Sequence, residues 1–240
     1  MTGLMQGCTC GRPRFGEYIL GCVYEAIMTA PPDPIRIFRL MHLDNLAVCL
    51  QDNGLYAPNK IPLDGSTYKT IHDIDIQNVR QSRCVICGPQ GTIHDYVAFY
   101  FGMRSPMLYK LYKGQVDNYY EGQEPLIYLV STVQAINNTG LQFVFSDGHG
   151  IAAFTKWYDD LDNLKEIDWD TVYADYWRDT DDDLDRQRRK QAEFLVYSFC
   201  PWELVHEIGV VNTAARDRVS KILSNYADST PVKIRENWYY

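Results

Sequence analysis

The position of one carboxylate in the sequence needs a physical explanation. Glu193 opens an apolar, strand-like run and comes directly after the basic stretch 186–190. A carboxylate that enters a buried strand costs free energy unless it is paired or used in chemistry. Two roles are therefore open: Glu193 is a catalytic group in a cleft, or it pairs with Arg189 or Lys190 at the strand end. The basic stretch is likewise either a solvated helix face that balances the acids at 181–185, or a set of phosphate contacts.

His42 is a second candidate, because it lies between a β-rich run, 35–41, and a helical pattern. A histidine at such a junction either binds a ligand or caps the helix. The sequence contains no Walker A loop, GxGxxG, GxSxG or HExxH motif, so most familiar active sites are excluded. The glycine pair at 88–91 fits either a surface turn or a backbone approach to phosphate.

The cysteines favour a protein with free thiols. The chain has seven cysteines, an odd number that does not suggest a disulfide framework. Two close pairs, Cys8 with Cys10 and Cys84 with Cys87, lack a second pair at zinc-site spacing. We therefore expect no metal ion, and a reducing, cytoplasmic setting.

The elements that must position these residues are mostly strands. Apolar runs predict strands at 35–41, 96–101, 107–112, 126–133, 141–145, 194–200 and 232–235. Helical spacing or composition predicts helices at 43–50, 169–178, 202–208 and 214–226, whereas 70–83 shows no clear pattern. Because the strands cluster without regular helix alternation, the sequence predicts an α+β fold in one domain.

Composition and charge set further limits. The chain has 240 residues, of which 46% are hydrophobic and 22% charged, as in a folded globular protein. No apolar run approaches the roughly 18 residues of a membrane span, so no membrane partner is expected. The net charge of −8 is local, since twelve acidic residues but only Lys165 and Arg178 lie within 159–185. A surface for nucleic acid is therefore permitted elsewhere, and this acidic segment should face away from it.

The first 34 residues differ from the rest of the chain. They are rich in Gly and Cys and end in Pro31-Pro32-Asp33-Pro34, which cannot continue a helix. We expect residues 1–34 to be a dispensable extension and residues 35–240 to form the functional domain.

Five segments, in this order, resemble one protein family. They read IFRLMHLDNL (37–46), HDYVAFYFGMRSPMLY (94–109), FVFSDGHG (143–150), RKQAEFLVYSFCPWELV (189–205) and ENWYY (236–240). Together they resemble the DarT family of DNA ADP-ribosyltransferase toxins, which are encoded beside a macrodomain antitoxin called DarG. The similarity covers about 35–240, and the second and fourth segments are the most specific.

The resemblance implies an ADP-ribosyltransferase fold over 35–240, with a central, mainly antiparallel split β-sheet flanked by helices. It implies NAD+ as co-substrate, single-stranded DNA as acceptor and a DarG-like macrodomain antitoxin as partner. The favoured activity is transfer of ADP-ribose to thymine with release of nicotinamide. Transfer to guanine or to RNA, hydrolysis of NAD+, and a non-catalytic nucleic-acid-binding module on the same scaffold stay open as alternatives.

Matching positions imply roles for particular residues. Glu193 corresponds to the catalytic glutamate and Arg80 to the catalytic arginine, with Arg83 as the alternative because the family's double arginine reads Val79-Arg80 here. The residues expected to bind NAD+ are Arg39, His42, Asn45 and, by stacking, Tyr100. Those expected to bind DNA are Arg104, Ser105, Met107 and His149.

The first of these segments departs from the family pattern. The family strand commonly reads YHITH, whereas residues 38–42 read FRLMH, so Arg39 replaces a histidine and Met41 a threonine. Arginine at this motif contacts ribose or phosphate in other ADP-ribosyltransferase classes. The replacement is therefore compatible with activity.

The implied chemistry is coherent. The nicotinamide ribosyl bond breaks through an oxocarbenium-like state, which a carboxylate at Glu193 would stabilise. Glu193 would also take the proton from the acceptor ring nitrogen, and partial burial is expected to raise its pKa for that task. Arg80 would hold the pyrophosphate or the acceptor base. Single-stranded DNA is the substrate that costs less free energy to bind, because its bases need not be unpaired.

Overall fold

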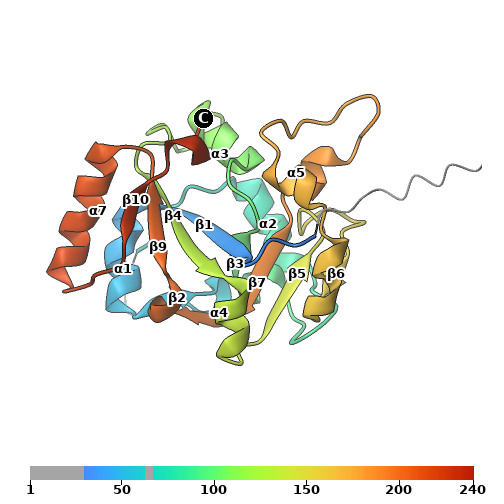
Figure 1. Ribbon diagram of the computed structural model, residues 1–240, viewed down its shortest axis with the longest axis horizontal. Coiled ribbons are helices and arrows are strands. Elements are labelled where there is room, and N and C mark those ends of the chain that lie inside the picture. The colour runs from blue at the N-terminus through green and yellow to red at the C-terminus, as the bar shows by residue number, and fades with distance from the viewer. Residues whose placement is uncertain (1–29, 63–66) are drawn as a thin grey trace, which may run out of the picture.

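An eight-stranded sheet forms the centre of the computed structural model, which describes residues 30–62 and 67–240 (Figure 1). Its strands are β1 (Arg36–His42), β3 (Tyr96–Tyr100), β4 (Leu126–Thr132), β5 (Phe143–Ser146), β6 (Trp157–Tyr158), β7 (Glu193–Tyr197), β9 (Glu207–Val210) and β10 (Val232–Ile234). They lie in the order β10-β9-β4-β1-β3-β7-β5-β6, and every pairing except β10 with β9 is antiparallel. Two further strands, β2 (Gly54–Tyr56) and β8 (Phe199–Pro201), pair separately. The predicted α+β fold with a mainly antiparallel sheet is confirmed.

The sheet is split between β1 and β3. β1 pairs with β4 along its whole length, but within the described chain it pairs with β3 only through Phe38 and Tyr100. Arg39 spans the opening, since its Nη1 donates a hydrogen bond to the carbonyl of Ala98 at 2.9 Å. A side chain thus satisfies a backbone acceptor that the neighbouring strand leaves unpaired. The split leaves room for a site in the middle of the sheet.

Strand β7 is buried on both faces, which explains its continuous apolar sequence. Phe194 and Val196 pack into one hydrophobic cluster, and Leu195 packs into another on the opposite face. Because strand side chains alternate, Glu193 shares the face of Leu195. The strand therefore carries its acid toward the split from a rigid, fully packed element.

Helices surround the sheet (Figure 1). They are α1 (Leu46–Gln51), α2 (Ile74–Ser82), α3 (Pro106–Tyr112), α4 (Val133–Asn138), α5 (Trp169–Tyr173), α6 (Arg186–Arg189) and α7 (Thr213–Asn225). α1 and α7 lie together at the end of the sheet formed by β9 and β10, and α5 lies at the opposite end (Figure 1). No helix in 30–62 or 67–240 is long and apolar enough to cross a bilayer.

Three expectations about local structure were wrong. Residues 107–112 form a helix rather than a strand, because Ser105 caps it, Pro106 starts it, and Leu108 and Leu111 bury one face. The predicted helix 202–208 is a 3₁₀ turn followed by β9, which pairs with β4.

The single strand expected over 194–200 is interrupted at Ser198, whose φ of 66° turns the chain from β7 into β8. The segment 70–83, which showed no pattern, contains α2, capped by Asp73. Residues 1–29 lie outside the described part of the chain, so the dispensable extension at 1–34 stays a prediction.

Candidate active site

Three adjoining cavities open at the split of the sheet. The central cavity, about 90 Å³, is lined by residues of β1, α2, β3 and β7, among them Arg39, Arg80, Tyr100 and Glu193. A large cavity of about 390 Å³ shares Arg39, His72 and Gln77 with it. An outer cavity of about 190 Å³ shares His72, Tyr100 and His149 with it. The central cavity therefore connects a roomy compartment on one side to a smaller one on the other.

A buried ion pair lies in the wall of the central cavity. Arg80, on α2, donates from Nη1 to Oε1 of Glu193 at 3.0 Å and from Nη2 to Oε2 at 2.7 Å. Oε1 also accepts the backbone N–H of Gly150 at 2.9 Å. Glu193 is 1% exposed and Arg80 is 8% exposed. The structure thus brings together the two residues predicted as catalytic, although they lie 113 positions apart in the sequence.

The expected alternative partners of Glu193 are engaged elsewhere. Arg189 pairs with Asp168 and Asp183. The Nζ of Lys190 donates to the carbonyls of Val172 and Ala174, each at 2.8 Å. The idea that Glu193 pairs with either of them at the strand end was wrong.

The ionisation of Glu193 also differs from expectation. Burial alone would raise its pKa, but the charge and hydrogen bonds of Arg80, with smaller effects of His149 and the Gly150 N–H, hold the pKa of Glu193 below its ordinary value. Glu193 in turn raises the pKa of Arg80 against the opposing effect of burial. The predicted upward shift for Glu193 was wrong, because the sequence did not reveal the arginine that faces it. The pair is ionised at neutral pH.

Arg39 keeps part of its donor capacity for a ligand. It lines both the central and the large cavity. Its Nη1 is bound to Ala98, but its buried Nε has no hydrogen-bond partner among the described residues. A buried donor without a partner is costly, which makes Nε a natural contact for an anionic or hydroxyl group in the cavity.

His42 and Asn45 have structural contacts instead. His42 is fully buried, and its Nδ1 accepts from the backbone N–H of Asp44 at 3.1 Å while its Nε2 meets Glu121 at 3.3 Å. It caps the 3₁₀ turn at 43–45 and is not among the described residues that line the three cavities. Its contact with NAD+ stays a prediction. Asn45 lines the large cavity, and its side chain binds both the N–H and the carbonyl of Lys69. It therefore shapes the cavity wall.

The residues predicted to face DNA divide into two pairs. Met107 and His149 line the central and outer cavities. Ser105 is buried and accepts from the N–H of Leu108 as the helix cap, and Arg104 pairs with Asp175 at 2.7 Å. Neither of these two is among the described residues that line the three cavities.

Sequence reasoning missed His72 and Gln77. Both line all three cavities. Burial, together with the charges of Arg39 and Arg80, lowers the pKa of His72 to about 4, so the imidazole is neutral near pH 7. Its Nδ1 has no hydrogen-bond partner in the described chain. The available signal was Asp73, a typical helix N-cap directly after His72, which marks the start of α2.

The other features singled out in the sequence lie apart from this chemistry. Cys49, Cys84, Cys87 and Cys200 are free thiols. In the part of the chain that the structure describes, no group of three His, Cys, Asp or Glu side chains could hold a metal ion. The turn at 88–91 directs the N–H of Gly88 to Asp159 at 2.8 Å.

Comparison with known proteins identifies the family. Residues 38–240 match the family model described as DarT, an ssDNA thymidine ADP-ribosyltransferase. The chain belongs to the DarT family. A DNA ADP-ribosyl transferase of Thermus sp. (strain 2.9) is 40% identical over 211 residues, which is 87% of this chain and 98% of that protein.

Two solved structures of the DarT family extend this likeness. Thermus sp. 2.9 DarT in complex with ADP-ribosylated ssDNA is 39% identical, with a TM-score of 0.83 over 89% of this chain and all of that one. The same protein in complex with NAD+ gives a TM-score of 0.78 at 38% identity, over 88% of this chain and all of that one. The DarT protein of Thermus sp. 2.9, whose fold this chain shares, has thus been solved with NAD+ and with ADP-ribosylated ssDNA.

Removing Arg80 tests the ion pair. In Arg80→Met, Glu193 is left buried and unpaired, so the free energy of unfolding at pH 7 should fall by about 3–5 kcal/mol. The pair stabilises the fold above the ordinary glutamate pKa, and this contribution disappears as pH falls through the lowered pKa of Glu193. The difference between wild type and variant should therefore shrink on acidification. Urea denaturation at several pH values measures it.

The double variant Arg80→Met/Glu193→Gln is the control, because it removes the uncompensated charge. It should recover much of the lost stability. A loss below about 1 kcal/mol in the single variant, as for an exposed pair, would contradict a buried bidentate interaction.

Proposed function

We propose that this protein transfers ADP-ribose from NAD+ to thymine in single-stranded DNA and releases nicotinamide. The observation that carries the proposal is Glu193, ionised by Arg80 in the wall of a cavity at the split sheet. Membership of a family described as ssDNA thymidine ADP-ribosyltransferase supplies the reaction.

NAD+ is placed in the central and large cavities. Together they offer a compartment in the usual range for a small-molecule site, with Arg39 on the wall that they share. The free donor of Arg39 suits the pyrophosphate or a ribose hydroxyl. Tyr100, on the wall of the central cavity beside Glu193, supplies an aromatic face for the nicotinamide.

Glu193 and Arg80 carry the transfer. The bond between the ribose anomeric carbon and the nicotinamide nitrogen breaks, and the carboxylate of Glu193 stabilises the positive charge that develops on the sugar. A bond forms between that carbon and the ring nitrogen of thymine, whose proton passes to Glu193 or to a water that it orients. Arg80 stabilises Glu193 as the anion and can offer a remaining N–H of its guanidinium to the acceptor base.

The outer cavity is assigned to the acceptor base. Met107 and Ile151 give it apolar walls that suit a methyl-bearing base, and Gln187 and Gln191 add amide groups. Lys110 also lines this cavity; its Nζ lies 3.6 Å from Asp73, and its half-exposed side chain can contact a phosphate. A thymine from single-stranded DNA reaches such a recess without first leaving a base pair.

A macrodomain antitoxin of the DarG type is proposed as the partner. Its support is the resemblance of five ordered segments to toxins encoded beside such an antitoxin.

Replacing the acid tests the mechanism. Glu193→Gln keeps the shape of the side chain but removes its charge, so transfer of ADP-ribose to a thymine-containing oligonucleotide should fall at least about a hundredfold. Mass spectrometry of the oligonucleotide after incubation with NAD+ measures it.

The matched control is Glu207→Gln on β9. Glu207 is also buried, at 6% exposed, and is also held by an arginine through two hydrogen bonds, from Arg235 at 2.7 and 2.9 Å. This variant should lose stability and keep transfer. Equal transfer by Glu193→Gln and wild type would remove Glu193 from the mechanism.

The base acceptor is tested with oligonucleotides that differ at one position. We expect the mass of ADP-ribose only on the strand with thymine, because the apolar side chains of Met107 and Ile151 in the outer cavity suit its methyl group. Modification of guanine instead would indicate a guanine-directed transferase, and modification of an RNA strand would indicate an RNA-directed one. Nicotinamide release without DNA would indicate an NAD+ hydrolase, and no turnover at all a binding module.

A further inference from the structure

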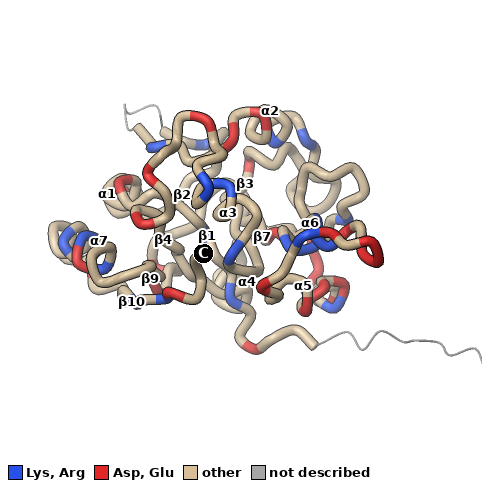
Figure 2. The backbone as a smooth tube through the Cα atoms, turned by 90° about the horizontal axis from the view of Figure 1, so that it is seen from above, with Lys and Arg blue, Asp and Glu red and all other residues tan. Residues whose placement is uncertain are grey.

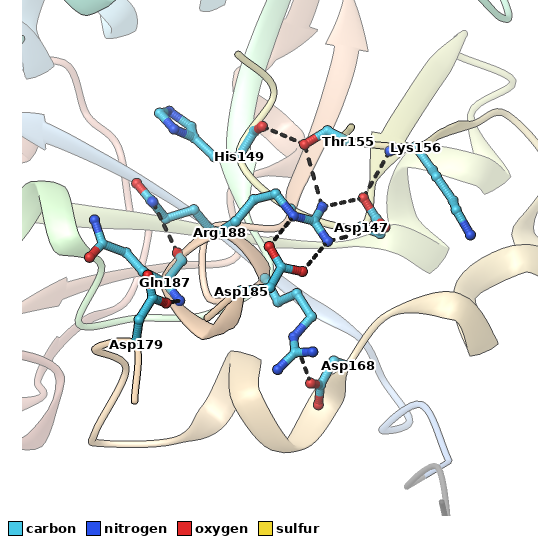
Figure 3. A network of polar contacts seen from close by, with 12 residues as sticks. Asp147, His149, Thr155, Lys156, Asp168, Asp179, Asp185, Gln187 and Arg188 are labelled. Atoms are coloured by element: carbon cyan, nitrogen blue, oxygen red, sulfur yellow. Dashed lines mark hydrogen bonds and ion pairs between the residues drawn. The ribbon is translucent and has the colours of Figure 1, made fainter. Parts of the chain in front are cut away.

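Arg188 is at the centre of a polar network that links α6 to the loop between β5 and β6 (Figure 3). Its Nε and Nη2 each donate to one carboxylate oxygen of Asp185 at 2.7 Å, and its Nη1 donates to Asp147 at 2.7 Å. The Oγ1 of Thr155 lies 3.4 Å from the same Nη1. The Arg188 side chain is only 11% exposed. Its donors are therefore used inside the protein.

This network fastens the loop 147–156, which connects β5 to β6. Asp147 begins the loop, and its Oδ1 also accepts the N–H of Lys156 at the far end, at 2.9 Å. The Thr155 hydroxyl donates to the carbonyl of His149 at 2.7 Å. Both ends of the loop are thus tied, through side chains, to Arg188, while the carbonyl of Ala152 in the middle of the loop accepts from Arg83 at 2.8 Å.

The backbone of Arg188 ties the same loop from the other side. Its carbonyl accepts the N–H of His149 at 2.9 Å. Gly148 runs so close to Arg188 that a β-carbon there would overlap the guanidinium and the carbonyl. Gly150, which follows His149 in the chain, donates its N–H to Oε1 of Glu193. A continuous set of contacts therefore runs from Arg188 through His149 and Gly150 to the carboxylate.

The remaining basic residues of α6 show that this arrangement is particular to Arg188. Arg186 donates from Nε to the carbonyl of Tyr176, and its Nη1 lies 3.9 Å from Asp183. Arg189 pairs with Asp168 and Asp183. Of these three arginines, only Arg188 reaches the loop 147–156 in the contacts just given. Figure 2 shows that the basic residues of α6 lie near acidic residues of the neighbouring segments around α5.

We propose that Arg188 is a positioning residue for ADP-ribose transfer: with Asp147 and Thr155 it fixes the loop 147–156, so that His149 and the Gly150 N–H face Glu193. The inference rests on the proposed function for its kinetic consequence. It assigns Arg188 to the inside of the protein rather than to DNA phosphate, and it gives Asp185, at the end of the acidic segment 159–185, a task.

The test compares Arg188→Met with wild type in steady-state transfer to a thymine-containing oligonucleotide. A loop displaced by about 1 Å should reduce kcat by about a hundredfold. The KM for NAD+ should stay within about twofold, because Arg188 touches no part of the cavities assigned to NAD+. Arg186→Met is the matched control, since it removes the same charge from the same helix and should leave kcat unchanged.

A milder variant and a second readout complete the design. Thr155→Val removes one hydroxyl and no charge, so it should fold, and it should reduce kcat by about tenfold. The double variant Arg188→Met/Asp147→Asn should lose no more activity than Arg188→Met, because both act through one network. Hydrogen exchange should be faster at residues 147–156 in Arg188→Met and in Thr155→Val, but unchanged in α7.

The outcomes separate the two proposals. Wild-type kcat in both Arg188→Met and Thr155→Val, or a rise in KM alone, overturns the positioning role while leaving the proposed function intact. Absence of transfer by wild type overturns the proposed function, and hydrogen exchange then decides whether Arg188 holds the loop. Unchanged hydrogen exchange at residues 147–156 in the two variants would show that Arg188 does not hold the loop, and would overturn the positioning role as well.

Discussion

The buried ion pair between Arg80 and Glu193 is the interaction on which the site depends. A lone carboxylate at 1% exposure would take up a proton rather than remain charged, and a lone guanidinium would be equally costly. Each charge offsets the free-energy cost of burying the other, and Nη1 and Nη2 of Arg80 each donate to one oxygen of Glu193. The pair therefore keeps a negative charge in a wall of the cavity where a sugar cation can form.

The fold supplies the two halves of this pair from different directions. β7, packed on both faces, fixes Glu193, and α2 brings Arg80 to it across the cavity. The split between β1 and β3 leaves the space in which they meet, and Arg39 spans that split. The loop 147–156 adds a third direction through Gly150. A rigid sheet with one opening thus brings three distant segments, β7, α2 and the loop 147–156, together at one carboxylate.

Several of these features could be predicted from the sequence, and the reasons are physical. The strand that carries Glu193 is recognisable because its apolar run is continuous, and the acid at its start is conspicuous for the same reason. The pairing of Glu193 with Arg80 could not be derived from the sequence, because it joins residues 113 positions apart; the resemblance indicated Arg80 as catalytic but not as the partner of Glu193. Residues 107–112 were misread as a strand, since aromatic residues favour strands and the cap at Ser105 was not weighed. The position of His42 at a strand end fits a ligand contact as well as a cap; the structure shows the cap, and the contact with NAD+ stays a prediction.

The ionisation of Glu193 is the most direct test of this account. Carbon NMR of protein with labelled glutamate, titrated in wild type and in Arg80→Met, with Glu193→Gln to assign the signal, reports the pKa of this one carboxyl group. The account predicts a pKa below the ordinary 4.5 in wild type and above it once the arginine is removed. A wild-type pKa above 4.5, or one that Arg80→Met leaves unchanged, would contradict it.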